Sequence, residues 1–159
     1  MLGKLNNQEI ENVFKEQLIG RIGCHANNIT YIVPTSYAYD GETIYARAHE
    51  GLKIELMRKN PHVCFQVDII ENMGNWKSVI AWGEFRELTE TLKRNSAIQK
   101  LLDRKIPGIA SNTVKLTADW PFSSEDDLSA IPGIIFSILI NEKTGRFEKS
   151  DEVNMLAVL

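Results

Sequence analysis

The feature that most restricts the fold is a series of short β-prone segments that follow one another with no helix between them. Turn-forming pairs separate these segments, Asn27-Asn28 first and Asp40-Gly41 second. Asp-Gly is a strong hairpin signal, because both central residues of the tightest hairpin turns have positive φ. Parallel α/β folds need a crossover helix between strands, so the series predicts an antiparallel sheet. The segments are residues 19–25, 30–39 and 42–48.

Further elements fit a small barrel with a few interspersed helices. Asn6 and Glu9 resemble a capping box before a helix that reaches Leu18. The strand predicted over 76–88 is apolar on both faces, so it must be covered twice. A barrel core can cover one face, and a helix or a second subunit the other. The remaining expected helices span 51–60 and 89–105, and the remaining strands span 63–70 and 134–142, the latter turning at Thr144-Gly145 into 146–149. We therefore predict one mainly β domain over 1–159, with a docked apolar tail after Asp151.

Composition excludes several functional classes. The chain has 18 basic and 21 acidic residues, a net charge of −3, which disfavours a nucleic-acid partner. Its most apolar stretch, 131–140, is far shorter than the ~20 residues of a membrane-spanning helix, and residues 1–9 lack the apolar core of a secretory signal. Cys24 and Cys64 form no C-x-x-C motif. We expect a cytoplasmic protein with reduced thiols and no metal site.

Lys53 is unusual for its position. It falls in the first turn of the predicted helix 51–60, where the helix dipole disfavours a cation by about 0.3–1 kcal/mol. An anion held at this helix start by backbone N–H groups and Lys53 would remove the conflict, and Arg47 on the preceding strand could supply a second cation. Two cations and a helix start suit a phosphate monoester. The alternative is that Lys53 points to water or pairs with Glu50 or Glu55.

Pro34 lies within the predicted strand 30–39. Proline cannot donate to a strand ladder, so the strand is expected to be at an edge or interrupted there. Unpaired backbone groups at this point could bind the edge of a flat heterocycle, with hydroxyls from Thr35 and Ser36 nearby. An ordinary edge-strand proline is the alternative.

The remaining patterns carry little catalytic signal. Trp76 and Trp82, with Ser78 between them, indicate core or interface packing, and stacking on a cofactor is the alternative. No nucleophile elbow, P-loop or dinucleotide fingerprint is present in the sequence.

Taken together, the motifs resemble the pyridoxamine-phosphate-oxidase-like flavin-binding split barrels, and within them the nitroimidazole-resistance-type proteins. The matching segments are GCH at 23–25, YIVPTSYAYDG at 31–41, IY at 44–45, GLK at 51–53, MRKNPHVCF at 57–65 and WKSVIAWG at 76–83. The resemblance implies a six-stranded antiparallel Greek-key split barrel. It also implies a homodimer with FMN in two grooves between the subunits.

By this resemblance, specific residues are expected to hold the cofactor. The strand Val33, Pro34, Thr35 and Ser36 would hold the flavin ring edge. Arg47 and Lys53 would bind the phosphate, and Trp76, Ser78 and Val79 would approach from across the groove. His49 is also expected among the cofactor-binding residues.

The resemblance also bears on activity. Many relatives carry His where this chain has Arg47. His49, two residues later, could replace it as a proton donor, and an ordinary surface histidine is the alternative. We expect a flavin-dependent oxidoreductase that passes hydride from NAD(P)H or another donor to a small organic acceptor. Two alternatives stay open. One is a non-enzymatic flavin carrier or sensor. The other is a haem-binding split barrel with His25, His49 or His62 as axial ligand.

Overall fold

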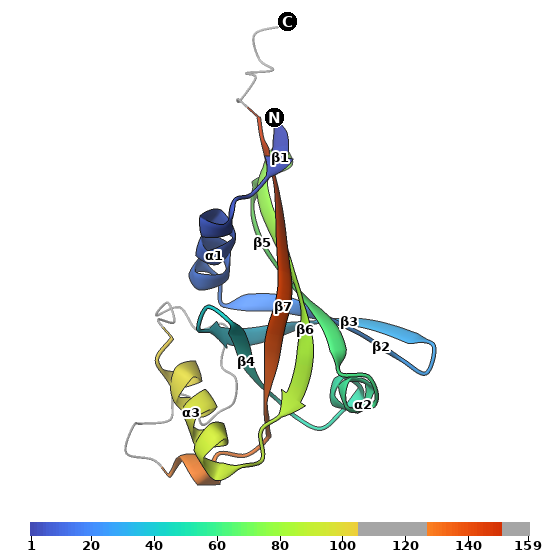
Figure 1. Cartoon of the computed structure of the whole chain (residues 1–159), viewed down its shortest axis with the longest axis vertical. Coiled ribbons are helices and arrows are strands. Elements are labelled where there is room, and N and C mark those ends of the chain that lie inside the picture. The colour runs from blue at the N-terminus through green and yellow to red at the C-terminus, as the bar shows by residue number, and fades with distance from the viewer. Residues whose placement is uncertain (105–126, 151–159) are drawn as a thin grey trace, which may run out of the picture.

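Six strands close into an antiparallel barrel in the computed structural model, which describes residues 1–104 and 127–150. The order around the barrel is β7-β4-β3-β2-β5-β6, and pairing of β6 with β7 closes it (Figure 1). The barrel strands are β2 (Ile19–Ala26), β3 (Ile29–Tyr39), β4 (Thr43–Ala48), β5 (His62–Asn72), β6 (Asn75–Glu87) and β7 (Ile134–Lys149). The predicted antiparallel split barrel is confirmed. The predicted tail after Asp151 lies outside the described residues.

Helix α1 (Asn7–Glu16) closes one end of the barrel. The predicted capping box is present, since the Asn6 side chain accepts from the Glu9 amide and the Glu9 side chain accepts from the Asn6 amide. One face of α1 carries Ile10, Val13 and Phe14, all buried in the barrel core. A short strand that the sequence did not reveal, β1 (Leu2–Lys4), precedes the helix and pairs with the far end of β7.

The two predicted turns differ from each other. Asn27 and Asn28 have φ of 52° and 60°, so they form the tight two-residue turn between β2 and β3. At Asp40-Gly41 only Gly41 has positive φ, and the Asp40 carboxylate accepts from the amides of Glu42 and Thr43. The expectation of two positive φ values at Asp40-Gly41 was therefore wrong, because the aspartate side chain caps a wider loop.

Strand β7 is continuous, so the turn predicted at Thr144-Gly145 was also wrong. Residues 142–149 stay paired with β6, with Gly145 opposite Val79. A Cβ at Gly145 would lie 2.8 Å from Leu5 and 2.9 Å from Ile10. The glycine is needed because the chain around α1 packs directly on β7, not because the backbone reverses there.

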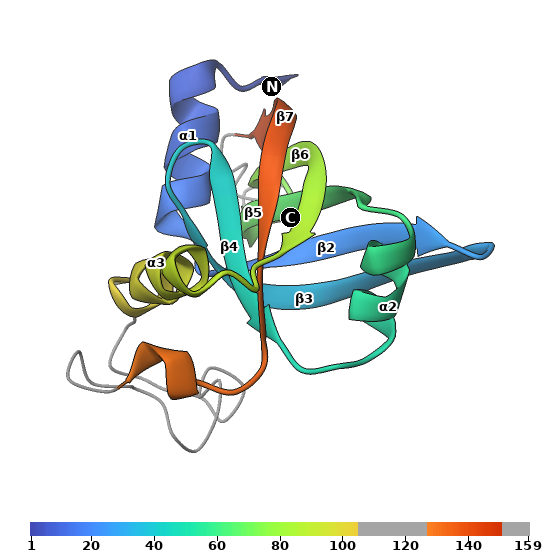
Figure 2. The same cartoon turned by 60° about the horizontal axis from the view of Figure 1, so that its bottom comes forward.

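A second, smaller core lies outside the barrel. Helix α3 (Thr91–Leu102) packs Ala97, Ile98 and Leu101 against Ala38 and Ile135 of the barrel wall. Figure 2 shows α3 on one side of the barrel and α2 (Leu52–Lys59) on the other. The 3₁₀ turn η1 (Leu128–Ala130) leads into β7 beside α3.

Strand β6, which corresponds to the strand predicted over 76–88, is covered only on its barrel face along most of its length. The side chains of Val79, Ala81 and Phe85 fill the barrel core, whereas Trp82 on the outer face is 42% exposed. No helix within residues 1–104 and 127–150 is long and apolar enough to cross a bilayer.

We predict that Asn6→Ala destabilises the fold by about 1 kcal/mol, because the first turn of α1 loses its side-chain acceptor. Urea denaturation followed by circular dichroism measures the change. Asn12→Ala, an exposed change on the same helix, is the control and is expected to stay within about 0.5 kcal/mol of the wild type. Equal stabilities of the two variants would contradict the assigned role of the cap.

Candidate functional site

The barrel is split where β4 leaves β3. These two strands pair only from Tyr37 to Tyr39 of β3, opposite Ile44 to Ala46 of β4. Within the described ranges, residues 29–36 of β3 pair with β2 alone. Pro34 stays in register opposite Arg21, so β3 is an open edge at Pro34 and is not interrupted.

The open edge offers backbone groups to a ligand. The Tyr37 amide donates to the Leu18 carbonyl at 3.1 Å, so the backbone of Tyr37 faces β2. Backbone polar groups alternate along an antiparallel strand, which places those of Thr35 toward β2 and those of Pro34 and Ser36 toward the open edge. The missing N–H of Pro34 therefore removes no ladder bond, and the carbonyls on this edge remain available.

Lys53 reaches this edge from the start of α2. Its ammonium lies 3.3 Å from the hydroxyl of Thr35, which is only 6% exposed. Neither alternative partner holds Lys53, since Glu50 pairs with Arg58 and Glu55 is exposed. Burial lowers the pKa of Lys53, because desolvation disfavours its charged form. The structure therefore brings together Lys53 and Thr35, which are 18 residues apart.

The start of α2 is uncovered at Gly51. Gly51 is the N-cap of α2, and a Cβ built on it would meet nothing within 4 Å. The helix thus begins at an exposed residue, two positions before the half-buried Lys53. Such a helix start fits a phosphate group, because free amides and a cation both favour negative charge there.

Arg47 and His49 lie at the end of β4, on the way to α2. The Arg47 side chain donates through Nε to the carbonyl of Pro132 at 2.7 Å. Arg47 thereby holds the turn that enters β7, a contact that the sequence pattern did not predict. His49 is exposed in the loop after β4.

Trp76, Ser78 and Val79 lie two strands away from Lys53. Val79 is fully buried, so its side chain faces the core. The Trp76 indole donates to Glu148 at 3.0 Å, and Gln66 donates to the Ser78 hydroxyl at 3.0 Å. Strands β2 and β5 lie between β3 and β6, a separation of about 14 Å at the usual strand spacing.

Trp76 and Ser78 nevertheless line a hollow of their own. This shallow cavity, of about 320 Å³, is formed by Arg21, Gln66, Asp68, Ile70, Trp76, Lys77 and Ser78. Within one chain, the predicted residues thus form two separate half-sites, one at the β3 edge and one on β6.

Arg104 is a residue of this region that sequence reasoning missed. Its guanidinium donates to the Ser36 hydroxyl and, at 3.0 Å, to the Tyr37 carbonyl. Burial lowers the pKa of Arg104 to about 10. Arg104 follows α3, 68 residues after Ser36, and no local pattern around it indicates the contact.

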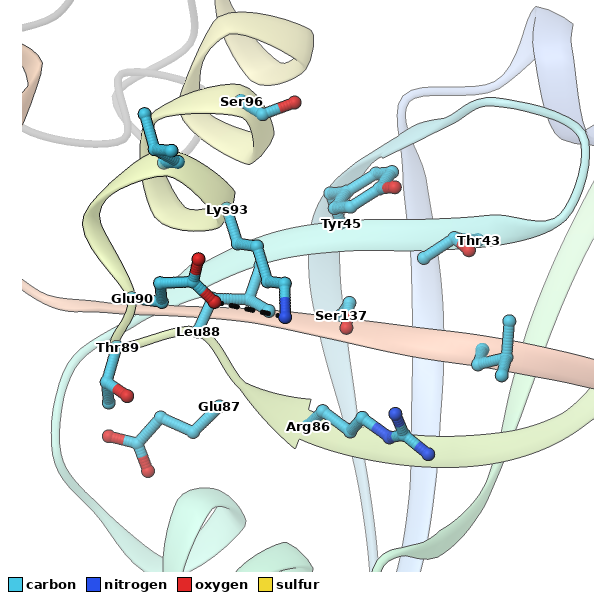
Figure 3. A pocket seen from close by; sticks show the side chains of 12 residues that line it. Thr43, Tyr45, Arg86, Glu87, Leu88, Thr89, Glu90, Lys93, Ser96 and Ser137 are labelled. Atoms are coloured by element: carbon cyan, nitrogen blue, oxygen red, sulfur yellow. Dashed lines mark ion pairs between the residues drawn. The ribbon is translucent and has the colours of Figure 1, made fainter.

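A different cavity, of about 580 Å³, lies between α3 and the outer surfaces of β4, β6 and β7 (Figure 3). Its charged groups are largely paired: Lys93 with Glu90 at 3.0 Å, and Glu87 with Arg58 at 2.8 Å. This pairing makes it a weaker anion site than the β3 edge. Among residues 1–104 and 127–150, no cluster of His, Cys, Asp and Glu could hold a metal ion.

Comparison with known proteins identifies related folds. An FAD-binding protein from Mesorhizobium loti has 32% identity and a TM-score of 0.71, covering 94% of this chain and 99% of its own. A Bacteroides thetaiotaomicron protein named for 5-nitroimidazole antibiotic resistance has 16% identity and a TM-score of 0.67, covering 92% and 87%, and this similarity concerns the fold alone.

A shorter match joins the chain to an uncharacterized protein of Rhizobium meliloti, 33% identical over 87 residues, or 55% of this chain and 58% of that one. The family model for pyridoxamine 5'-phosphate oxidase matches residues 6–146, which include the split between β3 and β4 and the whole of α2. The chain therefore belongs to the pyridoxamine 5'-phosphate oxidase family.

Proposed function

We propose that this chain binds FMN and acts as a flavin-dependent oxidoreductase on a small organic acceptor. The observation that carries the proposal is the open edge of β3, with Lys53 held against Thr35 beside the start of α2. The edge suits the donors and acceptors of the flavin ring, and the helix start suits a phosphate monoester. A flavin is also consistent with the FAD-binding relative, and the single terminal phosphate of FMN suits the uncovered start of α2.

We propose further that two copies of the chain form each binding groove. The outer face of β2, β3, β5 and β6 carries exposed apolar side chains: Ile19 at 49%, Ile32 at 69%, Ile70 at 67% and Trp82 at 42%. Large exposed apolar side chains gathered on one face of a sheet are typical of an interaction site. A second copy seated on this face would cover these residues and bring its own Trp76 and Ser78 toward the β3 edge of the first.

The chain's own residues supply binding, orientation and charge. Lys53 and the α2 amides would hold the phosphate, and Arg47 would border it while fixing the turn at Pro132. The carbonyls of the β3 edge would accept from the ring, and Trp76 of the partner copy would exclude water from its face. When bound, the flavin supplies the hydride chemistry, taking hydride from NAD(P)H or another donor and passing it to the acceptor.

A non-enzymatic flavin carrier or sensor is the second candidate. It is favoured by the exposure of His49 in the loop after β4, since an exposed histidine is not fixed as a proton donor beside the ring. For the haem alternative, His25, His49 and His62 are each exposed, and His25 is within 2.9 Å of the Thr30 hydroxyl. The absorption spectrum of the purified protein separates a flavin from a haem.

We predict that Lys53→Ala weakens FMN binding by about 1–3 kcal/mol, the usual loss for a hydrogen bond to a charged group. A flavin fluorescence titration measures the affinity. The control is Lys59→Ala, an exposed lysine in the last turn of the same helix, which is expected to bind FMN as the wild type does. Unchanged FMN affinity in Lys53→Ala would reject the phosphate assignment.

We predict that Ile32→Glu converts a dimer into a monomer and lowers FMN affinity at least tenfold, because it places a charge in the covered apolar face. Light scattering after gel filtration measures the mass. Leu92→Glu, on the exposed side of α3, is the matched control and is expected to stay dimeric. A wild-type protein that is monomeric with FMN bound would refute the shared groove.

The enzyme and carrier hypotheses predict different turnover. For an oxidoreductase, we expect the FMN-loaded protein to oxidise NAD(P)H repeatedly when a nitroaromatic or quinone acceptor is present, with His49→Ala slowing the proton-dependent step. Absorbance at 340 nm under anaerobic conditions follows the reaction. Stoichiometric reduction of the bound flavin without turnover, across several donors and acceptors, would support the carrier instead.

A further inference from the structure

The cavity between α3 and the outer surfaces of β4, β6 and β7 is built on a row of three side chains (Figure 3). Tyr45 of β4 lies opposite Ser137 of β7, and Ser137 lies opposite Arg86 of β6. Residues directly opposite one another in antiparallel strands share a face of the sheet. From α3, Leu92 and Ser96 line the cavity as well. No residue of β3 lines it, although β3 is fully described, so the cavity is separate from the proposed flavin site.

A serine in the middle strand explains why this surface is hollow. Ser137 is the smallest side chain of the row and lies between an aromatic ring and a guanidinium. The cavity has a volume of about 580 Å³. Pockets that bind small molecules usually measure roughly 300–1,000 Å³. The hollow beside Ser137 therefore has the size of a small-molecule site.

The Ser137 hydroxyl is a hydrogen-bonding group that the chain leaves unused. Ser137 is only 7% exposed, and within residues 1–104 and 127–150 its hydroxyl has no hydrogen-bond partner. Thr35, which is buried to a similar degree, has Lys53 as its partner. A buried hydroxyl without a partner destabilises a fold, so such groups are rare. A ligand oxygen that bonds to Ser137 would remove this cost.

The charges around the cavity favour an uncharged ligand. Two basic and two acidic side chains line it: Arg86, Lys93, Glu87 and Glu90. The Lys93 ammonium lies 3.0 Å from Glu90, Glu87 is paired with Arg58, and the Arg86 guanidinium lies 3.5 Å from Glu84. Each charge thus has a partner of opposite sign. A charged ligand group would have to leave water without a free counter-charge, which is unfavourable.

The apolar part of the lining suits an aromatic ring. Leu88, Leu92 and Leu139 contribute aliphatic surface, and the last two are 78% and 41% exposed. Tyr45 contributes an aromatic ring, which is held in place because its hydroxyl donates to Asp40 at 2.9 Å. Aromatic rings pack favourably on one another in stacked or edge-to-face arrangements. The lining therefore combines one free hydroxyl with aliphatic and aromatic surface.

We propose that this cavity is a binding site for a small uncharged aromatic molecule that carries a hydroxyl or carbonyl oxygen. The oxygen of the ligand bonds to the Ser137 hydroxyl, and its ring packs against Tyr45 and the leucines of the lining. The site uses none of the residues at the β3 edge. The chain therefore binds such a molecule whether or not a flavin is present.

Three phenols of similar size and different charge test the site. They are para-ethylphenol, which is uncharged, tyramine, which is a cation, and para-hydroxyphenylacetate, which is an anion. The full chain is titrated with each phenol, and amide NMR spectra locate the binding. Saturable shifts at Ser137, Leu139 and Leu92 are expected with para-ethylphenol, and both charged phenols are expected to bind at least about threefold more weakly. Equally tight binding of a charged phenol would overturn the ligand class, and the absence of saturable shifts with para-ethylphenol would overturn the site.

Two changes at Ser137 separate the role of the hydroxyl from that of the space. Ser137→Ala is expected to weaken para-ethylphenol binding about five- to tenfold, the usual loss for one hydrogen bond. The same variant is expected to melt at a higher temperature than the wild type without ligand, because it removes a buried hydroxyl that has no partner. Ser137→Leu fills the hollow and is expected to abolish binding. Thr144→Leu, an exposed change on the same strand, is the control and should bind normally. Wild-type affinity in either Ser137 variant would overturn the proposal.

A change at Lys93 tests the charge balance without disturbing the interior, because 71% of its side chain is exposed. Lys93→Glu leaves three acidic groups and one basic group around the cavity, so tyramine is expected to bind more tightly than para-ethylphenol. An unchanged order of affinities would show that the phenols bind elsewhere and would overturn the site. FMN affinity is expected to stay the same in all of these variants. Failure of FMN to bind the wild type would concern the proposed function alone.

Discussion

The separation of β4 from β3 is the constraint on which the rest of the site depends. Up to Tyr37 and Ala46 the two strands share a ladder, and beyond them β4 follows β7 alone toward α2. An unpaired strand edge is a liability in most folds, because its backbone groups invite pairing with other chains. Here Lys53 contacts Thr35 and Arg104 contacts Ser36 of this edge. Charged side chains at an edge are one of the ways in which proteins discourage strand addition.

The same separation explains the positions of the helices. Because β4 leaves the ladder, its continuation can place the start of α2 beside β3 and bring Lys53 to Thr35. Helix α3 then covers the paired portion of β3 and β4, where Ala38 packs against Ala97 and Leu101. Helix α2 thus lies beside the unpaired part of β3, and α3 covers the part that pairs with β4. Lys53 belongs to α2, and Arg104 follows α3.

The outer face of the barrel is the surface on which the proposed pairing of two chains depends. Its exposed apolar residues follow β2, β3, β5 and β6, and the half-site around Trp76 and Ser78 lies on that same face. The strand register separates this half-site from Lys53 by two strands, and no side-chain rotation closes such a gap. Association of two chains would cover the exposed apolar residues and bring a half-site of each chain together in the same interface.

The sequence by itself determined the elements and part of the site. The alternation of apolar residues, the hairpin turn at Asn27-Asn28 and the capping box at Asn6 are local signals, and each is present in the structure. Lys53 was identified by a local conflict with the helix dipole, and Pro34 by its missing N–H. Such signals can be recognised in a sequence because their physical causes lie within a few residues of each other along the chain.

Only the tertiary structure decided the contacts between residues that lie far apart in the sequence. Gly145 resembles a turn glycine in sequence, yet it is required by Leu5 and Ile10, which approach from the other end of the chain. Arg104 contacts Ser36 across 68 residues, and Arg47 contacts Pro132 across 85. Contacts of this kind depend on how strands and helices pack in three dimensions, and the periodicity of neighbouring residues contains no information about them.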